Sequence, residues 1–276
     1  MNGYSDKICI DGLEIFSNHG VLEAEKVLGQ KFVVCAELSL DLRRAGVTDD
    51  VAQTVSYAEV CADITGIVAG ETYDLIETCA ERVAGCVLGK YAPVREITVV
   101  VEKPWAPIGQ GVRNLSVRIT RRRVRAYLGL GANMGEPRAM LDAAIAGMAA
   151  ENLRVLRCSA YYTTKPVSDI AQDDYQNCVV EIETTLSPRE LMSHLLGVEA
   201  ALGRERHERW GPRVIDIDVL TYDDLVTEDA FITLPHPHLH ERMFVLEPLC
   251  ELNPHAVHPL LRRRMSQLKS DLEGTP

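Results

Sequence analysis

The sequence contains no long apolar run, no C-x-x-C motif and no basic leader followed by an apolar core. No window approaches the roughly 18 continuous apolar residues from which a membrane-spanning helix is inferred. The N-terminus, MNGYSDKICIDG, lacks the pattern of a secretory signal peptide. The eight cysteines stand mostly among apolar neighbours, which is typical of reduced core cysteines in a cytoplasmic protein. We therefore expect a cytoplasmic protein that does not enter a membrane.

Positive charge is also scarce. Lys and Arg number 29 against 40 Asp and Glu, so the net charge is −11 over 276 residues, which argues against a general nucleic-acid-binding protein. The basic run RRRVR at 121–125 has two interpretations, an RNA-binding patch or a solvated edge at the junction of two modules. The acidic balance of the chain favours the second interpretation, and the length is sufficient for two ordinary domains.

The first half of the sequence predicts a β-β-α-α-β-β order. Apolar residues alternate or recur at helical spacing. The expected strands are 8–16, 31–42, 95–103 and 111–121, and the expected helices are 57–70 and 74–91. The segment SNHGVLEAEKVLGQ between the first two strands is expected to be a loop. This order predicts an antiparallel sheet with both helices on one face.

The pattern restarts after the arginine run, so we predict a first domain over 1–122 and a second over 123–276. A capping box, formed by Ser187 and Glu190 around Pro188, marks the start of one helix. In the second half we expect four strands, at 124–131, near 153–163, near 174–185 and at 213–222. We expect four helices, at 136–150, 187–203, around 242–251 and 259–272. The predicted fold class is α+β, in two modules.

Residues 204–224, RERHERWGPRVIDIDVLTYDD, place a cluster of cations before two acids in an apolar strand. Side chains alternate faces along a strand, so Asp216 and Asp218 share one face at about 7 Å between Cα atoms. Two carboxylates at this spacing suit divalent cations, and arginines suit phosphate oxygens. This combination predicts phosphoryl or pyrophosphoryl transfer. The alternative is a surface ion-pair network; the tight clustering and Trp210, a possible stacking surface, favour the catalytic interpretation.

Several motifs resemble the 6-hydroxymethyl-7,8-dihydropterin pyrophosphokinase family of folate synthesis. The signature RWGPR-x-x-D-x-D is accompanied, in the family's order, by YLGLGANMG, YYTTKPV, DYQNCVV and LPHPHLHERMFVLEPL. The resemblance covers about residues 124–260 and implies a ferredoxin-like α/β/α module. It also implies transfer of pyrophosphate from ATP to the hydroxymethyl group of a dihydropterin, with release of AMP.

The resemblance implies a role for each matching residue. Asp216 and Asp218 would hold two Mg²⁺ ions, while Arg204 and Arg213 would also stabilise the charge that shifts between phosphates. The residues expected to contact ATP are Glu199, Arg204, Arg209, Trp210, Arg213, Thr233, His236 and Arg242. The residues expected to hold the pterin are Thr164, Val167, Tyr175, Asn177 and Phe244, with the two aromatic rings stacking and the amide bonding to the pterin edge.

Viewed without the family, some of these residues have other interpretations. Tyr175 and Phe244 fit a strand core and a helix core equally well. His236, His238 and His240 alternate along an extended segment and could form part of a zinc site, although no cysteine or further histidine stands nearby with ligand spacing.

The first half resembles the dihydroneopterin aldolase family over about residues 5–121. The family's pattern appears as His19-Gly20, Glu25 and Gly29-Gln30, followed by TVSYAEV, DLIETCAERVA and VVVEKPWAPIG. The resemblance implies a tunnelling-fold module. It also implies a homo-oligomeric ring, tetrameric or octameric, with pterin sites between neighbouring subunits. By this resemblance the aldolase site needs no cofactor, neither zinc nor a Schiff base.

A retro-aldol cleavage needs a base for a side-chain hydroxyl and an acid for the carbanion left on the ring. Lys103 at a strand end can serve as acid or base if it is partly buried. Tyr57 at a helix start can relay a proton, and Glu25 would by resemblance assist with the hydroxyl or an ordered water. Glu77 could accept hydrogen bonds from the pterin edge, with Ile76 beside it; its other interpretation is a favourable charge near a helix N-terminus.

Together the two resemblances predict a bifunctional enzyme. The first module would cleave 7,8-dihydroneopterin to glycolaldehyde and 6-hydroxymethyl-7,8-dihydropterin, and the second would pyrophosphorylate that product. The expected partners are pterins, ATP and further copies of the chain, with no nucleic acid and no membrane. The alternative is a non-catalytic pterin-binding or assembly protein.

Overall fold

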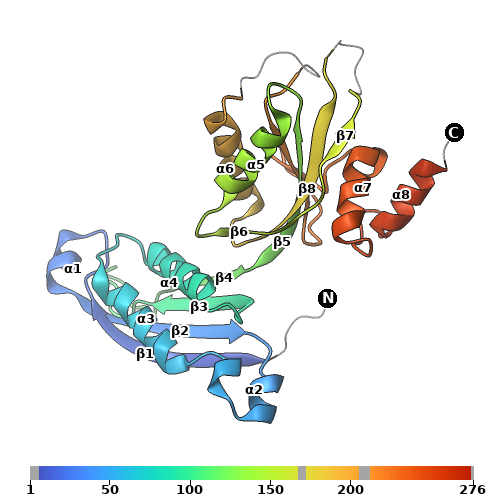
Figure 1. Cartoon of the computed structure of the whole chain (residues 1–276). Helices are drawn as coiled ribbons and strands as arrows, with labels where there is room; N and C mark the ends of the chain where they lie inside the picture. The colour runs from blue at the N-terminus through green and yellow to red at the C-terminus, as the bar shows by residue number, and fades with distance from the viewer. Residues whose placement is uncertain (1–5, 167–171, 205–211, 275–276) are drawn as a thin grey trace. The chain divides into compact units, whose positions relative to one another are not determined.

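The computed structural model describes residues 6–166, 172–204 and 212–274. The chain divides into two compact units between Arg123 and Val124 (Figure 1), one residue after the boundary proposed from the sequence. We call them the first unit and the second unit.

The first unit is a four-stranded antiparallel sheet in the order β1-β2-β3-β4, with α3 and α4 on one face (Figure 1). Its strands are β1 (Lys7–Ser17), β2 (Gln30–Ser39), β3 (Glu96–Glu102) and β4 (Ser116–Arg122). Its helices are α1 (Glu23–Leu28), α2 (Arg43–Thr48), the 3₁₀ turn η1 (Val51–Gln53), α3 (Tyr57–Gly70) and α4 (Ile76–Lys90). The predicted order of sheet and main helices is confirmed.

The core of the first unit follows from two periodicities. Alternate residues of β2 are fully or almost fully buried, namely Phe32, Val34, Ala36 and Leu38. In α3 the buried residues recur every four positions, at Val60, Ile64 and Val68. These two faces pack together in one apolar cluster. The sheet therefore holds its strand ends, where the candidate residues lie, in fixed positions.

The segment expected to be a loop between β1 and β2 contains a helix, α1. Its outward residues Val27 and Leu28 are 77% and 74% exposed, and the residue it buries is Glu25. Because the buried position is charged and the apolar positions are exposed, the helix carries no apolar periodicity. The sequence pattern therefore did not reveal it.

The second unit has three layers, with α5 and α6 on one face of an antiparallel sheet and α7 and α8 on the other. The sheet order is β6-β8-β5-β9, and β7 pairs with β8. Its strands are β5 (Val124–Ala132), β6 (Leu153–Cys158), β7 (Tyr162–Thr164), β8 (Tyr175–Thr184), β9 (Asp216–Tyr222), β10 (Thr227–Glu228) and β11 (Thr233–Leu234). Its helices are α5 (Pro137–Met148), α6 (Pro188–Ala201), the 3₁₀ turn η2 (Leu239–Glu241), α7 (Met243–Leu252) and α8 (Met265–Glu273). The predicted α/β/α layering is confirmed.

Local signals explain most element boundaries of the second unit. The capping box is present at α6, where the Ser187 amide donates to Glu190 Oε2 at 2.8 Å. β6 and β7 are separate because the Val179 amide bonds the Ser159 hydroxyl, at 3.0 Å, in place of a backbone carbonyl. The helix expected over 259–272 begins only at Met265, since the preceding turn places Arg262 at a φ of 56°.

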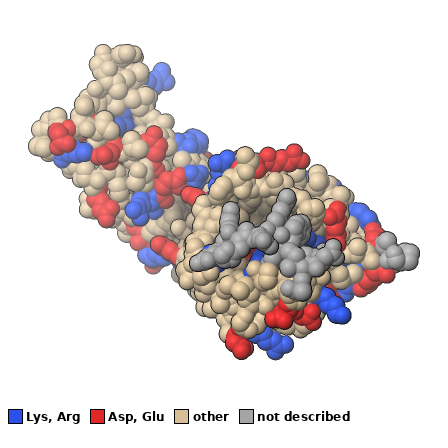
Figure 2. Space-filling model, turned by 90° about the horizontal axis from the view of Figure 1, so that it is seen from above, with Lys and Arg blue, Asp and Glu red and all other residues tan. Residues whose placement is uncertain are grey.

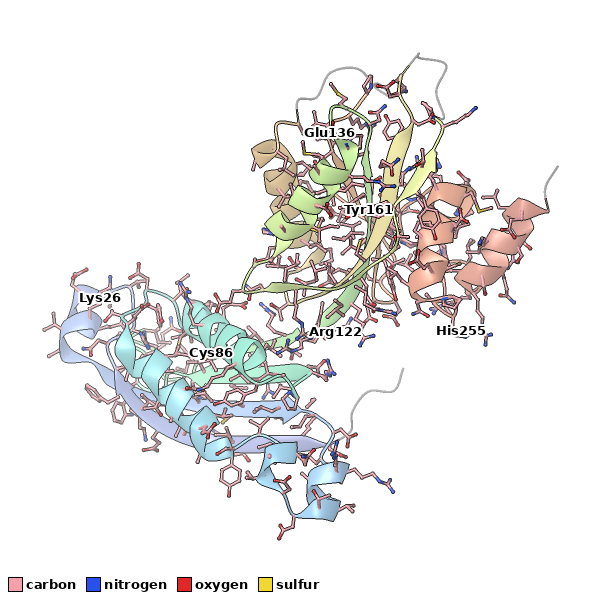
Figure 3. The ribbon with its side chains drawn as sticks, viewed as in Figure 1. Lys26, Cys86, Arg122, Glu136, Tyr161 and His255 are labelled. Atoms are coloured by element: carbon pink, nitrogen blue, oxygen red, sulfur yellow. The ribbon has the colours of Figure 1, made fainter. Side chains whose placement is uncertain are left out.

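Acidic and basic side chains are interspersed on the face of the molecule in Figure 2. Side chains from helices and strands fill the interior of each unit, while Lys26 and His255 extend outward (Figure 3). Among the residues that the structure describes, no helix is both long and apolar enough to cross a membrane.

Candidate active sites

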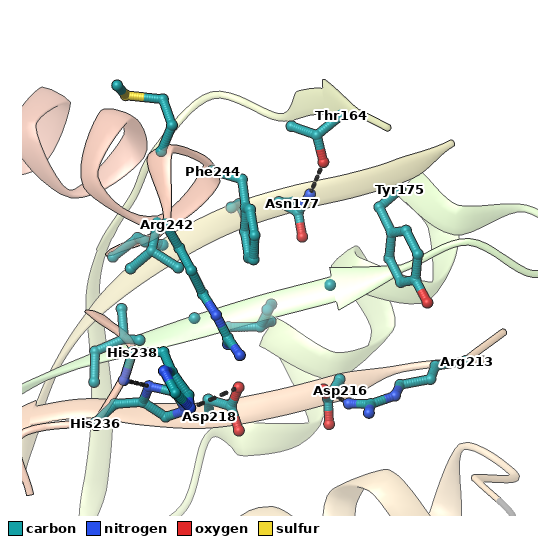
Figure 4. A pocket seen from close by; sticks show the side chains of 18 of the residues that line it. Thr164, Tyr175, Asn177, Arg213, Asp216, Asp218, His236, His238, Arg242 and Phe244 are labelled. Carbon is teal, nitrogen blue, oxygen red and sulfur yellow. Dashed lines mark hydrogen bonds and ion pairs between the residues drawn. The ribbon is translucent and has the colours of Figure 1, made fainter. Parts of the chain in front are cut away.

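A cavity of about 640 Å³ lies in the second unit between β5, β7, β8 and β9 on one side and the η2–α7 segment on the other (Figure 4). Its floor is set by strand register. Asp216 and Asp218 of β9 pair with Gly131 and Gly129 of β5, and Gly131 also pairs with Asn177 of β8. The glycines leave the floor open, because a Cβ on Gly131 would lie 2.8 Å from Asn177 Oδ1. Gly129 and Gly131 stand in the motif YLGLGANMG without a predicted role, although glycine at alternate strand positions is a signal of close backbone approach.

One end of the cavity is aromatic. Tyr175 and Phe244 lie on either side of Asn177 (Figure 4). Asn177 Nδ2 donates to Thr164 Oγ1 at 2.7 Å, and the Tyr175 hydroxyl donates to Gln172 at 3.0 Å. Both aromatic side chains line the cavity, so they are not solely core residues, although Phe244 also packs against the α7–α8 core.

The other end is ionic. Asp216 bonds Arg213 and, at 2.6 Å, Arg204. Glu199 bonds Arg204 and accepts the Ile217 amide at 2.7 Å. Burial raises the pKa of Glu199 even though Arg204 opposes the shift. Glu199 and Arg204 therefore hold β9 and Asp216 from behind the cavity lining.

Asp218 is the least compensated acid of this end. Its Oδ2 atom is 3.8 Å from His236 Nε2. Burial, followed by the charge of Asp216, raises the pKa of Asp218 to about 6, although 40% of its side-chain surface remains accessible to solvent. His236 Nδ1 accepts the His238 amide at 3.2 Å, and burial, followed by Arg242, lowers the pKa of His236 to about 4. His236 is therefore neutral at pH 7 and presents an Nε2 proton toward Asp218.

The donor set at Asp216 and Asp218 fits Mg²⁺. Two carboxylates face one cavity, and among the described residues Asp218 has no arginine or lysine within ion-pair distance, although Arg242 and Arg213 oppose the rise of its pKa. Mg²⁺ commonly takes one or two carboxylates and completes its shell with water and substrate phosphates. Within the described ranges no three His, Cys, Asp or Glu residues form a metal-binding group. The three histidines do not converge either, because the His240 ring packs against His258 at 5.7 Å between centroids.

Not every predicted residue of this site belongs to the described lining of the cavity. Val167, Arg209 and Trp210 fall outside the described residues. Thr233 lies on β11 and does not line the cavity. Arg242 does line it, with its guanidinium 5.7 Å from the Phe244 ring centroid.

In the first unit, Lys103 and Glu25 form a buried ion pair. Lys103 Nζ is 2.6 Å from Glu25 Oε1, and the two side chains are only 12% and 7% exposed. Glu25 also accepts Gln30 Nε2 and the Leu22 amide, each at 3.2 Å. Burial alone would raise the pKa of Glu25, but Lys103 and these hydrogen bonds lower it overall. The Glu25 carboxylate and the Lys103 side-chain nitrogen are thus held in direct contact.

Close backbone approach makes this ion pair possible. Gly20 has a φ of 152°, and a Cβ there would overlap the Glu25 carboxyl group. The Gly20 amide donates to the Tyr73 carbonyl at 3.0 Å, and Lys26 bonds Asp74 at 2.8 Å. The segment before α4 is thereby tied to the loop that carries Glu25, which brings the N-terminus of α4, with Ile76 and Glu77, to the same end of the sheet.

Tyr57 lies at the opposite end of the sheet. It borders an apolar depression with Ile8 and Leu42, near the pairing of Ile8 with Leu38, whereas Lys103 follows the pairing of Val33 with Glu102. The two pairings are five positions apart on β2, from Val33 to Leu38, which corresponds to roughly 17 Å. Tyr57 is 67% exposed, so within one chain it does not meet Lys103.

Comparison with known proteins matches this division. Residues 8–120 match the family described as dihydroneopterin aldolase, and residues 127–254 match the family of 7,8-dihydro-6-hydroxymethylpterin-pyrophosphokinase. A dihydroneopterin aldolase of Bacillus subtilis is 46% identical over 118 residues, covering 43% of this chain and 98% of the relative. A 2-amino-4-hydroxy-6-hydroxymethyldihydropteridine pyrophosphokinase of Methylorubrum extorquens is 50% identical over 134 residues, covering 48% of this chain and 85% of the relative. A folic acid synthesis protein of Dictyostelium discoideum is 28% identical over 295 residues, covering 97% of this chain and 44% of the relative.

The chain is therefore a two-domain enzyme of pterin chemistry. Its first unit belongs to the dihydroneopterin aldolase family and its second to the hydroxymethyldihydropterin pyrophosphokinase family. The predicted combination of a lyase and a transferase of folate biosynthesis is confirmed, and these relationships do not favour the non-catalytic alternative.

Proposed function

We propose that pyrophosphoryl transfer takes place in the cavity of the second unit. The pterin lies between Tyr175 and Phe244, and its edge bonds Asn177. Its hydroxymethyl oxygen attacks the β-phosphorus of ATP, the bond from that phosphorus to the α–β bridging oxygen breaks, and AMP leaves with the bridging oxygen. The observation that supports this assignment is that the aromatic pair and the two aspartates face one cavity.

Charge stabilisation in this reaction is assigned to groups at the ionic end. Asp216 and Asp218 would hold two Mg²⁺ ions, which when bound neutralise the phosphate oxygens. Arg213 and Arg242 line the same cavity and supply bidentate donors for phosphate. Arg204 stands next to Asp216, and neutral His236 donates from Nε2. Arg209, Trp210 and Thr233 remain predicted ATP contacts, and Val167 a predicted pterin contact.

We propose that Lys103 and Glu25 carry out the retro-aldol step of the first unit. A base takes the proton of the hydroxyl on the second side-chain carbon, the bond between the first and second carbons breaks, and glycolaldehyde leaves. The electron pair stays on the carbon attached to the ring, which Lys103 then protonates. Glu25, 2.6 Å from Lys103, holds the Lys103 side-chain nitrogen in place and contacts the hydroxyl or an ordered water. Glu77, with Ile76 beside it, holds the pterin edge, and no cofactor is assigned.

We further propose that Tyr57 serves a site on a neighbouring copy. Within one chain it is separated from Lys103 by about half the length of β2. Large apolar residues are exposed near the Lys103 end of the sheet, including Phe16 at 63%, Leu28 at 74% and Trp105 at 62%, and exposed apolar groups of this kind favour an interface. A homo-oligomeric ring, tetrameric or octameric, would join the two half-sites.

The combined function is tested by giving the protein 7,8-dihydroneopterin, ATP and Mg²⁺. Glycolaldehyde should form without ATP, whereas AMP and the pterin pyrophosphate should form only when all three are present. Supplying 6-hydroxymethyl-7,8-dihydropterin directly should produce AMP without glycolaldehyde. Failure to release AMP in that last reaction would contradict the assignment of the second unit.

A further inference from the structure

We propose that His19 is a positioning residue of the aldolase site, which orients Lys103 through its carbonyl oxygen and holds the segment before α4 through its ring. The inference rests on the proposed role of Lys103 as the acid of the retro-aldol step. His19 follows β1, and in the sequence it was recognised only as part of a His-Gly pattern without a task.

Two hydrogen bonds define this role. Lys103 Nζ donates to the His19 carbonyl at 3.2 Å, which together with Glu25 fixes the direction of the ammonium group. Through its side chain, His19 Nδ1 accepts a hydrogen bond from the Tyr73 amide at 3.1 Å. One residue thus contacts both the acid and the segment that leads to Glu77, on elements far apart in the sequence.

The imidazole is held rigidly in its place. His19 is 0% exposed. Its ring contacts Phe32 edge-on and stacks on Tyr73, at 4.9 Å and 5.1 Å between ring centroids. Burial lowers the pKa of His19, so the ring is neutral at pH 7 and Nδ1 stays free to accept the amide. The backbone that carries the carbonyl oxygen is therefore fixed by a side chain that does not reach solvent.

This placement predicts a selective effect on catalysis. If the ring loses its acceptor, the partly buried Tyr73 amide loses this hydrogen bond, and the backbone at His19 can shift relative to Lys103. Small displacements of a catalytic group reduce the rate more than they reduce binding of the substrate body. The aldolase kcat should fall more than the KM for dihydroneopterin changes.

The test uses the full-length protein and four variants. His19→Phe keeps the aromatic contacts but removes the acceptor, while His19→Asn restores an acceptor oxygen close to the Nδ1 position. His19→Gln is as polar but places its amide near the Nε2 position. Ser17→Ala is the matched control for the loss of a buried hydrogen bond beside His19: it removes the bond from Ser17 Oγ to the Val68 carbonyl at 2.6 Å, a carbonyl that also interacts with His19, and keeps the His19 bonds to Lys103 and Tyr73.

We expect the aldolase kcat of His19→Phe to fall between about tenfold and about a hundredfold. His19→Asn should recover most of that loss, and Ser17→Ala should stay near the unmodified protein. Pyrophosphokinase rates should be equal in all, which reports that the second unit is intact, and calorimetric unfolding of each variant reports whether the first unit is folded. If His19→Phe does not fold, the comparison of His19→Asn with His19→Gln decides, with the Gln variant expected to be the slower.

Equal kcat values for His19→Phe and Ser17→Ala, or for the Asn and Gln variants, would overturn the inference. A parallel Lys103→Ala variant separates this outcome from failure of the proposed function. If Lys103→Ala keeps its aldolase activity, the assignment of the acid is wrong and the role of His19 falls with it. If Lys103→Ala is inactive while the His19 variants are unaffected, only the inference about His19 fails.

Discussion

The two units distribute their candidate residues differently. In the second unit, the two aspartates and the two aromatic rings all line one cavity of about 640 Å³. In the first unit, Glu25 and Lys103 form a buried pair, whereas Tyr57 is exposed at the other end of the sheet. The second unit therefore contains the described part of its site within one chain, and the first contains two halves that do not meet.

This difference separates two ways of building an active site. A cavity between a sheet and a helical segment can be completed by a single chain, so its activity should not depend on assembly. Half-sites at opposite ends of one sheet can be completed only when copies associate head to tail, as heterologous contacts in a ring allow.

The largest effect is expected from the two aspartates of the second unit. Asp216→Asn or Asp218→Asn should lower the rate of AMP release by about a thousandfold, because each removes a charge needed beside the transferred phosphates. Glycolaldehyde release should be unchanged in both variants. Asp229→Asn serves as a control, since Asp229 pairs with Arg189 on the surface away from the cavity. A variant that kept full AMP release would show that these residues do not hold the metal.

The division of the aldolase site can be tested by mixing subunits. Lys103→Ala and Tyr57→Phe should each lower aldolase activity by about a hundredfold or more. In oligomers assembled from equal amounts of the two variants, about a quarter of the sites should combine an intact Lys103 with an intact Tyr57 from a neighbour. Glycolaldehyde release should recover to about that fraction.

The control for this experiment is a mixture of Lys103→Ala and Glu25→Gln chains. Lys103 and Glu25 contact each other within one chain, so no site in this mixture has both residues intact, and activity should not recover. Recovery in this control, or its absence in the Lys103→Ala and Tyr57→Phe mixture, would contradict the division of the site. Pyrophosphokinase activity should be the same in every mixture.

The periodicity and the capping residues of the sequence were enough to predict the face of β9 that carries the two aspartates and the start of α6. The alternation in RVIDIDVL placed Asp216 and Asp218 on one face, and their register with Gly131 and Gly129 agrees with that face. Ser187 and Glu190 marked the start of α6. These features are local, because each depends on residues a few positions apart whose side-chain directions follow from the strand or helix period.

Features that depend on tertiary contacts could not be read this way. α1 was missed because it buries Glu25 and exposes Val27, which reverses the expected pattern. The contact between Glu25 and Lys103 joins residues far apart in the sequence, and the separation of Tyr57 depends on which end of the sheet each loop reaches. Periodicity reports the face of an element, but it carries no information about the end of the sheet.

The pH dependence should also differ between the two sites. Because the pKa of Asp218 is raised to about 6, the carboxyl group binds a proton as the pH falls through that value and then competes with Mg²⁺. The Mg²⁺ concentration for half-maximal AMP release should rise by about tenfold per pH unit below pH 6. The aldolase reaction, to which no metal is assigned, should show no dependence on Mg²⁺ at any pH.

The same pKa gives a stability test without metal. A carboxyl group whose folded-state pKa is raised binds more protons when folded, so its contribution favours folding as the pH falls from about 6 toward the ordinary value near 4. Asp218→Asn should remove this dependence and raise the thermal stability of the second unit at pH 7, measured by calorimetry. If Asp218→Asn were less stable than the unmodified protein at pH 7, the charge of Asp218 would not destabilise the folded state.

The smallest effect concerns the floor of the cavity. Gly131→Ala would place a methyl group 2.8 Å from Asn177 Oδ1 and should displace that amide from the pterin edge, raising the KM for 6-hydroxymethyl-7,8-dihydropterin by about tenfold, the cost of one misplaced hydrogen bond. Gly129→Ala is the matched variant, because its Cβ would meet the flexible Leu220 side chain at 3.2 Å and should raise the KM less. Both should leave the KM of the aldolase for dihydroneopterin unchanged. If the two alanine variants raised the KM equally, Asn177 would not be the group that recognises the pterin edge, and the cavity would hold its substrate by aromatic stacking alone.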